Sequence, residues 1–234
     1  WEEKETSTEE EKLEIHRLGL LGREIKIAAE IASVLGNRWK NQSRFREAVK
    51  LCKSTLDITE DYRVLHSLAR SEKQLGDMEL AKQHYQQALE LCLQEDETEK
   101  ATIIHNLAGI YAQQGDVSQA ISLYQQSLEL KEKIGDVQGK AITLANLGKL
   151  LADEKQDFTT ALNYLQQSLE ILLHLKSPDA ETVEEWILEV RFNQLLHQSP
   201  EAQQLYQQLE SADEDTRNQI FSRLRELMDE FGNG

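Results

Sequence analysis

The chain has 234 residues, a formal net charge of −16, and only eleven glycines and two prolines. This length allows one elongated domain or two compact ones, and the abundance of Leu, Ala, Glu, Gln and Lys predicts an all-α protein because these residues favour helices. The negative charge argues against binding to nucleic acid or to an anionic membrane. Since neither a membrane-spanning apolar run nor a signal peptide is recognisable, we expect a soluble, cytoplasmic protein.

The charge is distributed unevenly along the chain. Residues 1–14 carry −5, residues 15–100 are neutral, and residues 101–234 carry −11. The neutral part is therefore the one that we expect to tolerate an acidic partner. Cys52 and Cys92 form no CxxC motif and no disulfide framework, and we interpret both as small buried apolar residues.

The N-terminal region, residues 1–28, is interpreted as an acidic tail followed by a helix. The tail is expected to be disordered because it combines a run of like charges with few apolar residues. Residues 8–22 predict the helix, with Ser7 and Glu10 as a capping box. This helix is either a degenerate repeat or a cap, and we expect Leu13, Leu18 and Leu21 to pack on the first repeat.

One pattern recurs four times between residues 29 and 176. Apolar residues follow the i, i+3, i+4, i+7 spacing of amphipathic helices, and each unit contains two such helices joined by a short turn. A leucine followed by a small residue marks the first helix of each unit, and an alanine marks the second. Small residues let helices approach closely, so we expect tight packing at these positions. The markers are Leu35, Gly36 and Ala48; Leu68, Ala69 and Ala81; Leu107, Ala108 and Ala120; and Leu147, Gly148 and Ala161.

The units differ in length and at one interior position. Their alanines lie 33, 39 and 41 residues apart. In the fourth unit the alanine follows the small residue by thirteen positions instead of twelve, which predicts one extra residue in the turn. A large apolar residue stands three positions after the small one at Trp39, Tyr111 and Leu151, whereas Glu72 interrupts the pattern.

Residues 177–234 are interpreted as an incomplete fifth repeat and C-terminal capping helices. Pro178 is well placed in the first turn of a helix, and residues 200–210 and 213–231 predict two more helices. The last helix is amphipathic. Folding back as a cap is the first interpretation, and dimerisation or partner binding is the alternative. Its apolar residues are Ile220, Phe221, Leu224, Leu227, Met228 and Phe231.

The leucine–small pair and the alanine resemble the tetratricopeptide repeat, and the match covers roughly residues 29–175. The spacings of 39 and 41 residues exceed the usual ~34 of that family and are similar to the longer repeats of kinesin light chains and spindle-orientation adaptors. The resemblance implies a right-handed α-solenoid of stacked antiparallel helix pairs with a concave groove lined by the first helices. It also implies a scaffold or adaptor that binds a peptide or helix of another protein in this groove.

The resemblance places a set of polar side chains along the groove. Asn106 and Asn146 occupy the same position of successive repeats, and their amides offer donors and acceptors to a peptide backbone. The first half of the groove is basic and favours an acidic peptide. Its basic residues are Arg63, Arg70 and Lys73, with Lys40 and Arg38 nearby. Ile142 and Asn146 replace the last basic pair of the family's carboxylate clamp, so we do not expect recognition of chaperone C-termini. The candidate partner-binding residues are Asn37, Lys40, Arg63, His66, Arg70, Lys73, His105, Asn106, Gln113, Asn146 and Lys149.

The sequence contains no recognisable catalytic motif. HExxH, GxSxG and Gly-rich phosphate loops are absent, and the six histidines are scattered. His66 and His105 occupy the same place in adjacent repeats, but further metal ligands are not evident. We therefore predict a protein that is not an enzyme, with no catalytic residues, no metal and no other cofactor.

Two alternative functions remain open. The chain begins at Trp1, which suggests a trimmed chain or a fragment, and similar arrays occur as sensor domains of bacterial signalling ATPases, although no Walker motif is present. The chain would then be a sensor or regulatory domain of a larger, bacterial-type signalling protein. In the second alternative it is a self-assembly module that uses the helix at residues 213–231. The expected oligomeric state is a monomer or a weak dimer.

Overall fold

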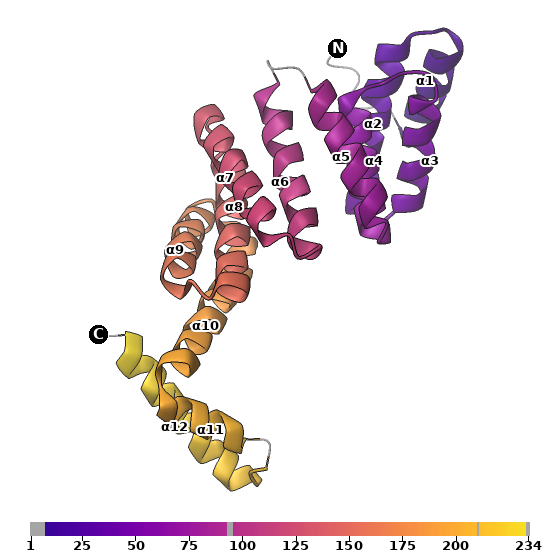
Figure 1. The fold of residues 1–234 in the computed structure, drawn as a ribbon. Helices are drawn as coiled ribbons and strands as arrows, with labels where there is room; N and C mark the ends of the chain where they lie inside the picture. The colour runs from indigo at the N-terminus through magenta and orange to yellow at the C-terminus, as the bar shows by residue number, and fades with distance from the viewer. Residues whose placement is uncertain (1–7, 93–95, 210, 233–234) are drawn as a thin grey trace. The chain divides into compact units, whose positions relative to one another are not determined.

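The computed structural model describes residues 8–92, 96–209 and 211–232. Every regular element in these residues is a helix, which confirms the all-α prediction. In chain order the helices are α1 (Glu9–Leu21), α2 (Ile25–Asn41), α3 (Phe45–Leu56), α4 (Tyr62–Leu75), α5 (Met78–Leu91), α6 (Glu97–Gln113), α7 (Val117–Ile134), α8 (Val137–Leu150), the π-helix η2 (Leu151–Lys155), α9 (Phe158–His174), α10 (Asp179–Gln198), α11 (Pro200–Gln208) and α12 (Glu214–Gly232) (Figure 1).

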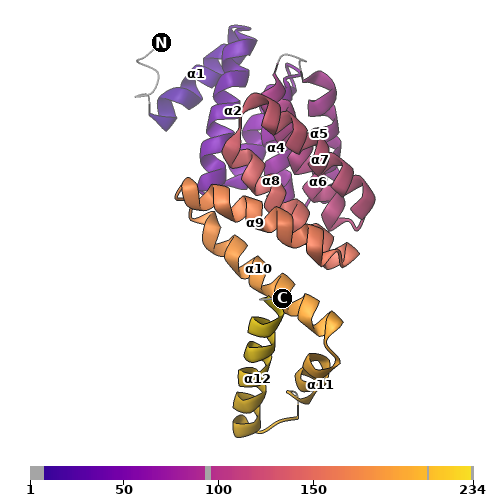
Figure 2. The ribbon, with the colours of Figure 1, turned by 90° about the vertical axis from the view of Figure 1, so that its left-hand side faces the viewer.

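The chain divides into two compact units, Trp1–Gly135 (unit 1) and Asp136–Gly234 (unit 2). In unit 1, α1 to α7 pack consecutively, and α4 also packs against α2 and α6. In unit 2, α8 packs against α9 and α9 against α10, and Figure 2 shows α11 and α12 beside the end of α10. The predicted solenoid of adjacent helix pairs is confirmed. The predicted domain boundaries after residues 28 and 176 stay predictions.

The repeated marker residues form the interior of each helix pair. All four marker leucines are at most 3% exposed, and all four marker alanines are fully buried. A buried serine adds a hydrogen bond to the third and fourth pairs: Ser127 donates to the Ala101 carbonyl and Ser168 to the Ala141 carbonyl, each at 2.8 Å. The sequence repeat therefore corresponds to a repeat of both apolar and polar contacts.

Close approach of the helix backbones explains the small residues. A Cβ added at Gly148 would lie 2.9 Å from the carbonyl oxygen of Ala161 on the paired helix. A Cβ at Gly36 would lie 3.2 Å from the Cβ of Ser67, on the first helix of the following pair. Gly36 thus sets the spacing between successive pairs. Gly148 sets the spacing within a pair, as the sequence predicted.

The extra residue of the fourth repeat is not simply a longer turn. It is absorbed by η2, in which the backbone widens to i→i+5 geometry directly after α8. Gln156 follows with a φ of 54°, where the corresponding turns of the second and third pairs use Gly76 and Gly115, also with positive φ. The prediction of an added turn residue is corrected to a π-helical bulge that keeps α8 and α9 in register.

Glu72 interrupts the apolar pattern and is nevertheless buried, with 1% of its surface exposed. His84 Nδ1 on α5 donates to Glu72 Oε2 at 2.6 Å, and Lys53 Nζ on α3 lies 3.6 Å from Oε1. Oε1 has no hydrogen-bond partner in the described part of the chain. Two cationic or donor groups from neighbouring helices therefore hold a carboxylate in a position that is apolar in the other repeats.

The first helix differs in detail from the prediction. Thr8 caps α1 and forms the capping box with Glu11, one residue later than expected, because the helix begins at Glu9; Ser7 lies outside the described residues. Leu13 packs on the first pair as predicted. Leu18 and Leu21 are 52% and 70% exposed, so their predicted packing is wrong. The buried residues of α1 are instead His16, which bonds Thr55 Oγ1 on α3, and Gly19, which approaches Ala28.

The last helix folds on its own unit. Ile220, Leu224 and Leu227 form a cluster with Leu195 of α10 and Ala202 of α11, and Met228 packs at its edge. Phe221 is 56% exposed, and the side chain of Phe231 lies outside the described residues. This packing favours the capping interpretation of α12.

Two further expectations concern the membrane and the cysteines. Across the described residues, no helix combines the length and the hydrophobicity needed to cross a bilayer. Cys52 is buried, and this burial raises the pKa of its thiol to about 12, which agrees with its interpretation as an apolar residue. Cys92 is only partly buried and lies 3.7 Å from the Asp96 carbonyl oxygen.

Two glycine-to-alanine substitutions should differ in their effect on stability. Gly148→Ala should lower the free energy of unfolding by about 1–3 kcal/mol because its Cβ meets the backbone of the paired helix. Gly109→Ala on α6 meets the flexible end of Lys73 at 3.1 Å, and we expect it to be neutral or to add up to about 1 kcal/mol of helix propensity. Urea unfolding of the two variants measures the difference, and an equal effect at both sites would contradict the close-approach explanation.

Removing the hydrogen-bond partner of the buried carboxylate should destabilise the fold more than replacing the carboxylate itself by an apolar residue. His84→Ala leaves Glu72 buried with only Lys53 nearby and should cost about 2–3 kcal/mol of unfolding free energy. Glu72→Leu restores the apolar residue of the other repeats and should stay within about 1 kcal/mol of the wild type or exceed it. Thermal unfolding of both variants tests this, and a larger loss for Glu72→Leu than for His84→Ala would refute it.

Candidate functional site

The candidate site in unit 1 is built on the first helices of three successive pairs, α2, α4 and α6. Helix α4 packs against both of the others. Arg63, His66, Arg70 and Lys73 follow one another on α4 at spacings of three and four residues, so they lie along one side of that helix. Side chains from α2 and α6 meet this row from its two sides, and we refer to the whole as the α4 face.

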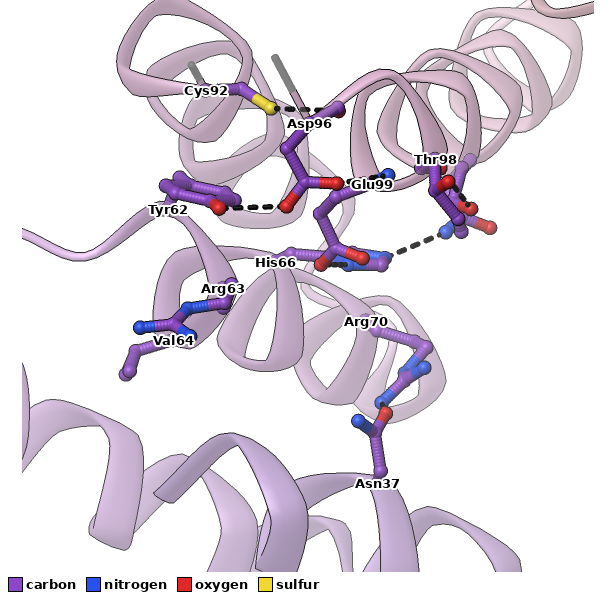
Figure 3. A network of polar contacts seen from close by, with 12 residues as sticks. Asn37, Tyr62, Arg63, Val64, His66, Arg70, Cys92, Asp96, Thr98 and Glu99 are labelled. Carbon is purple, nitrogen blue, oxygen red and sulfur yellow. Dashed lines mark hydrogen bonds and ion pairs between the residues drawn. The ribbon is translucent and has the colours of Figure 1, made fainter. Parts of the chain in front are cut away.

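His66 joins α4 to α6 (Figure 3). Its Nδ1 lies 2.6 Å from Glu99 Oε1, and its Nε2 lies 3.0 Å from Asn106 Nδ2. Nδ1–H therefore donates to the carboxylate while Nε2 accepts from the amide, which is the neutral tautomer. The ring is 5% exposed and contacts the ring of Tyr85 at 5.8 Å between centroids. His66 thus positions Asn106, and its buried ring is not placed to contact a partner directly.

Asn106 is half-buried on the α4 face. One N–H of its amide is used by His66, and its Oδ1 has no hydrogen bond in the part of the chain that the structure describes. An acceptor held in a fixed direction by a buried imidazole can receive a backbone N–H from an extended segment. This geometry suits the clamping role that the resemblance implies for Asn106.

Arg70 connects α4 to α2. Its Nη2 donates to Asn37 Oδ1, whereas its Nε is shielded from water and has no hydrogen-bond partner among the described residues. Burial lowers the pKa of the guanidinium, although Tyr85 and Glu99 partly offset this effect. An arginine nitrogen that has lost its water without gaining a protein acceptor is energetically costly. A ligand oxygen at this point would restore the missing hydrogen bond.

Two lysines extend the positive charge on either side of Arg70. Desolvation and the nearby charge of Arg70 lower the pKa of Lys40 on α2. Burial lowers the pKa of Lys73, whose ammonium lies over Gly109 on α6. Among the described residues, neither these lysines nor Arg70 forms an ion pair with a carboxylate. Their charges are therefore available to an anionic partner.

Arg63 does not add to this free charge. It forms two hydrogen bonds with Asp61, at 2.8 and 3.2 Å, and Asp61 also caps the N-terminus of α4. The basic part of the face is thus centred on Lys40, Arg70 and Lys73. Arg38 and Gln113, also considered from the sequence, are exposed near the ends of α2 and α6.

His105 repeats the position of His66 with a different environment. Its ring meets Tyr124 edge-on at 5.4 Å between centroids, and His66 meets Tyr85 of the preceding pair in a tilted arrangement at 5.8 Å. Burial, together with the positive charges of Lys131 and Lys73, lowers the pKa of His105 to about 3. His105 is therefore neutral throughout the physiological pH range.

Asn146 and Lys149 belong to α8 in unit 2. Asn146 Nδ2 donates to the Ile142 carbonyl one turn back, at 2.9 Å. Lys149 pairs with Glu189 at 2.9 Å and Asp153 at 3.0 Å; burial opposes its charge, but these two carboxylates outweigh it and raise its pKa. Lys149 is thus already neutralised, unlike Lys40, Arg70 and Lys73 of the α4 face.

Sequence reasoning missed the acidic partners at the start of α6. Asp96 caps this helix through the N–H of Glu99 and accepts from the Tyr62 hydroxyl at 2.7 Å, while Glu99 holds His66. The segment from Asp96 to Glu99 has the spacing of a helix N-terminus, a signal that was available in the sequence. Within the described residues, no group of three or more His, Cys, Asp or Glu side chains is arranged to hold a metal ion.

The neutral state of His105 should appear in the acid stability of the fold. Unfolding returns the pKa of His105 from about 3 towards its usual 6.5, so protonation stabilises the unfolded state as the pH falls through that window. Replacing it by His105→Gln should reduce the loss of unfolding free energy between about pH 7 and pH 4 by about 2 kcal/mol or more. Denaturant titrations at several pH values measure this slope.

The exposed His174 supplies the matched control for this measurement. His174→Gln should leave the pH dependence close to that of the wild type. A slope that is unchanged in His105→Gln, or changed equally in both variants, would show that His105 is not the group responsible.

Comparisons with known proteins agree with this architecture. The sequence model of the tetratricopeptide repeat family matches residues 60–133 and 99–173. A search of curated proteins finds no match. Among solved structures, BtubC (BKLC) from P. vanneervenii is similar with a TM-score of 0.63 and 20% identity, over 95% of this chain and 89% of that one.

Two further structures share the fold at lower coverage. The APC/C hetero-tetramer Cut9–Hcn1 gives a TM-score of 0.60 and 21% identity over 69% of this chain and 29% of that one. The apo form of RapI gives 0.61 and 15% identity over 85% of this chain and 63% of that one. At these identities the likeness shows the fold alone. The in-phase repeats, the helix pairs and the family match together establish that the chain belongs to the tetratricopeptide repeat family.

Proposed function

We propose that this protein is a non-catalytic scaffold that binds a segment of another protein along the α4 face. The observation that carries the proposal is Arg70, whose Nε is buried without a hydrogen-bond partner in the described chain. Lys40 and Lys73 flank it without carboxylate partners there, and Asn106 offers a fixed acceptor. An acidic segment would satisfy the three cations, and its backbone N–H groups would meet the amide oxygen.

The repeat family supports a protein ligand, because its members are generally scaffolds for protein–protein interaction. The Cut9–Hcn1 structure, which shares the fold, is a hetero-tetramer. The charge of the α4 face narrows this general role to an acidic partner, since complementary charge steers the encounter and rejects basic segments. A cytoplasmic adaptor is the cellular setting that fits such a role.

The two alternative functions, self-assembly and a sensor domain, make different demands on the structure. In self-assembly through α12, Ile220, Leu224 and Leu227 would have to leave the cluster that they form with α10 and α11. A role as the sensor domain of a larger signalling protein is compatible with the same face, which would then bind a segment of the same polypeptide. Whether the chain acts as an adaptor or as a sensor domain, the α4 face would recognise an acidic segment.

Selection from displayed random peptides tests the proposal. The wild-type chain should enrich peptides rich in Asp and Glu. Arg70→Gln and Lys40→Gln should each weaken binding of an enriched peptide by about tenfold or more, since the ligand anion loses a desolvated partner. Affinity should also fall steeply with added salt for the wild type.

Arg46→Gln is the matched control, because Arg46 is an exposed arginine of α3, a helix that contributes no residue to the α4 face as defined above. It removes the same charge and should change affinity by no more than about twofold. Circular dichroism and melting curves should show that all variants keep the fold. Enrichment of peptides without acidic residues, or equal affinity for wild type and Arg70→Gln, would contradict the proposal.

A further inference from the structure

Unit 2 contains an apolar cavity between α8 and α10, with a volume of about 170 Å³. Its lining includes Leu172 and Val183, which are 1% and 3% exposed, and the half-buried Ile142 and Trp186. Trp186 packs its ring against the core of the unit. From the sequence alone Trp186 is indistinguishable from a core residue, because a large apolar residue at helical spacing predicts a core position.

The size and lining of the cavity restrict what it can hold. A cavity of about 150 Å³ lined by apolar side chains stays dry and binds a benzene-sized molecule. The space beside Trp186 therefore suits one branched aliphatic or aromatic side chain, and its apolar walls do not favour ordered water. A whole helix or a larger ligand exceeds this volume.

Three polar residues also line the cavity, and we take the two that are exposed to mark its mouth. Thr182 and Asp179 of α10 are exposed at this mouth, and Asn146 of α8 lines it as well. The Asn146 Nδ2 donates to the Ile142 carbonyl of its own helix, and its Oδ1 accepts no hydrogen bond in the described part of the chain. This oxygen can accept a backbone N–H from a chain that inserts a side chain into the cavity.

The charge around the mouth selects the neighbouring residue of the ligand. Asp179 is the charged residue that lines the cavity. Helix α10 carries five carboxylates and one arginine, and residues 136–234 hold eighteen acidic and eight basic residues. An acidic group beside the inserted side chain would be repelled, whereas a basic group would be attracted.

We propose that the cavity between α8 and α10 binds a single large apolar side chain of a partner protein that is adjacent to a basic residue. The proposal rests on the proposed function, because it makes the cavity a second recognition site of the same scaffold. It differs in ligand chemistry from the α4 face, which selects acidic residues. The two sites thus make separate demands on the partner sequence.

Three small probes that carry nearly the same branched apolar group but different charges distinguish recognition of shape by the cavity from recognition of charge. They are 3-methylbutylammonium, the neutral 3-methylbutanol, and 4-methylpentanoate. Binding to the full chain is followed by NMR through the indole N–H signal of Trp186, which the spectrum of Trp186→Phe identifies among the three tryptophans. The ammonium probe should bind at least about tenfold more tightly than the carboxylate, with the alcohol between them.

Paired variants on α10 locate the binding site. Thr182→Leu fills the mouth and should weaken the ammonium probe by about tenfold or more, whereas Glu181→Leu, an equally exposed neighbour outside the cavity, should not. Asp179→Asn should remove most of the preference for the ammonium over the alcohol. Glu184→Gln, which removes a charge of the same helix outside the lining, should largely keep it.

Several results would overturn the proposal. They are the absence of any Trp186 response to the probes, equal binding by Thr182→Leu and wild type, or a preference for the carboxylate. A concentration-dependent dimer that Thr182→Leu dissociates would also overturn it, because a second copy of the chain would then cover the cavity. Loss of acidic-peptide selection with intact probe binding would refute the proposed function of the α4 face alone, and the reverse pattern would refute the cavity site alone.

Discussion

The close approach of paired helices at small residues is the constraint on which the rest of the structure depends. A helix pair cannot bury its own apolar face, so each pair is stable only when its neighbours cover it. Gly148 lets α8 approach the backbone of α9, and Gly36 lets α2 approach Ser67 on α4. The Gly148 contact sets the separation within a pair, and the Gly36 contact sets the separation of the first helices α2 and α4, and with it the distance between the polar side chains that these two helices carry.

The electrostatics of the α4 face follow from this packing. Because α4 lies against both α2 and α6, the side chains on its flank lose water without the chain supplying a carboxylate for each cation. Arg70 and Lys73 are held in this condition, and burial lowers the pKa of both. The same packing supplies Glu99 to His66 and Asp61 to Arg63, so the difference between a free and a neutralised cation depends on single neighbours.

Which neighbour each side chain acquires in the folded chain could not be predicted from the sequence. Helical periodicity and the leucine–small–alanine register predicted the fold, because both depend on residues within one repeat. They could not predict that Leu18 and Leu21 face solvent, since this depends on which surface of α2 is left for α1 to cover. Glu72 looked like a break in the pattern, and only the tertiary arrangement brings His84 and Lys53 to it. The π-helix after α8 likewise depends on keeping two helices in register across an inserted residue.

The candidate sites show the same division. The sequence indicated Arg70 and Asn106, which lie on the adjacent helices α4 and α6, but it did not separate Arg63, which is neutralised, from Lys40, which is not. It also passed over Trp186, because a core tryptophan and a cavity-lining tryptophan have the same periodicity. Unit 1 presents cations and unit 2 an apolar cavity beside Asp179, so the ligands that we propose for the two units differ in charge. A partner that engages both must therefore carry its acidic residues and its basic–apolar residues in separate segments, a stricter requirement than net charge alone.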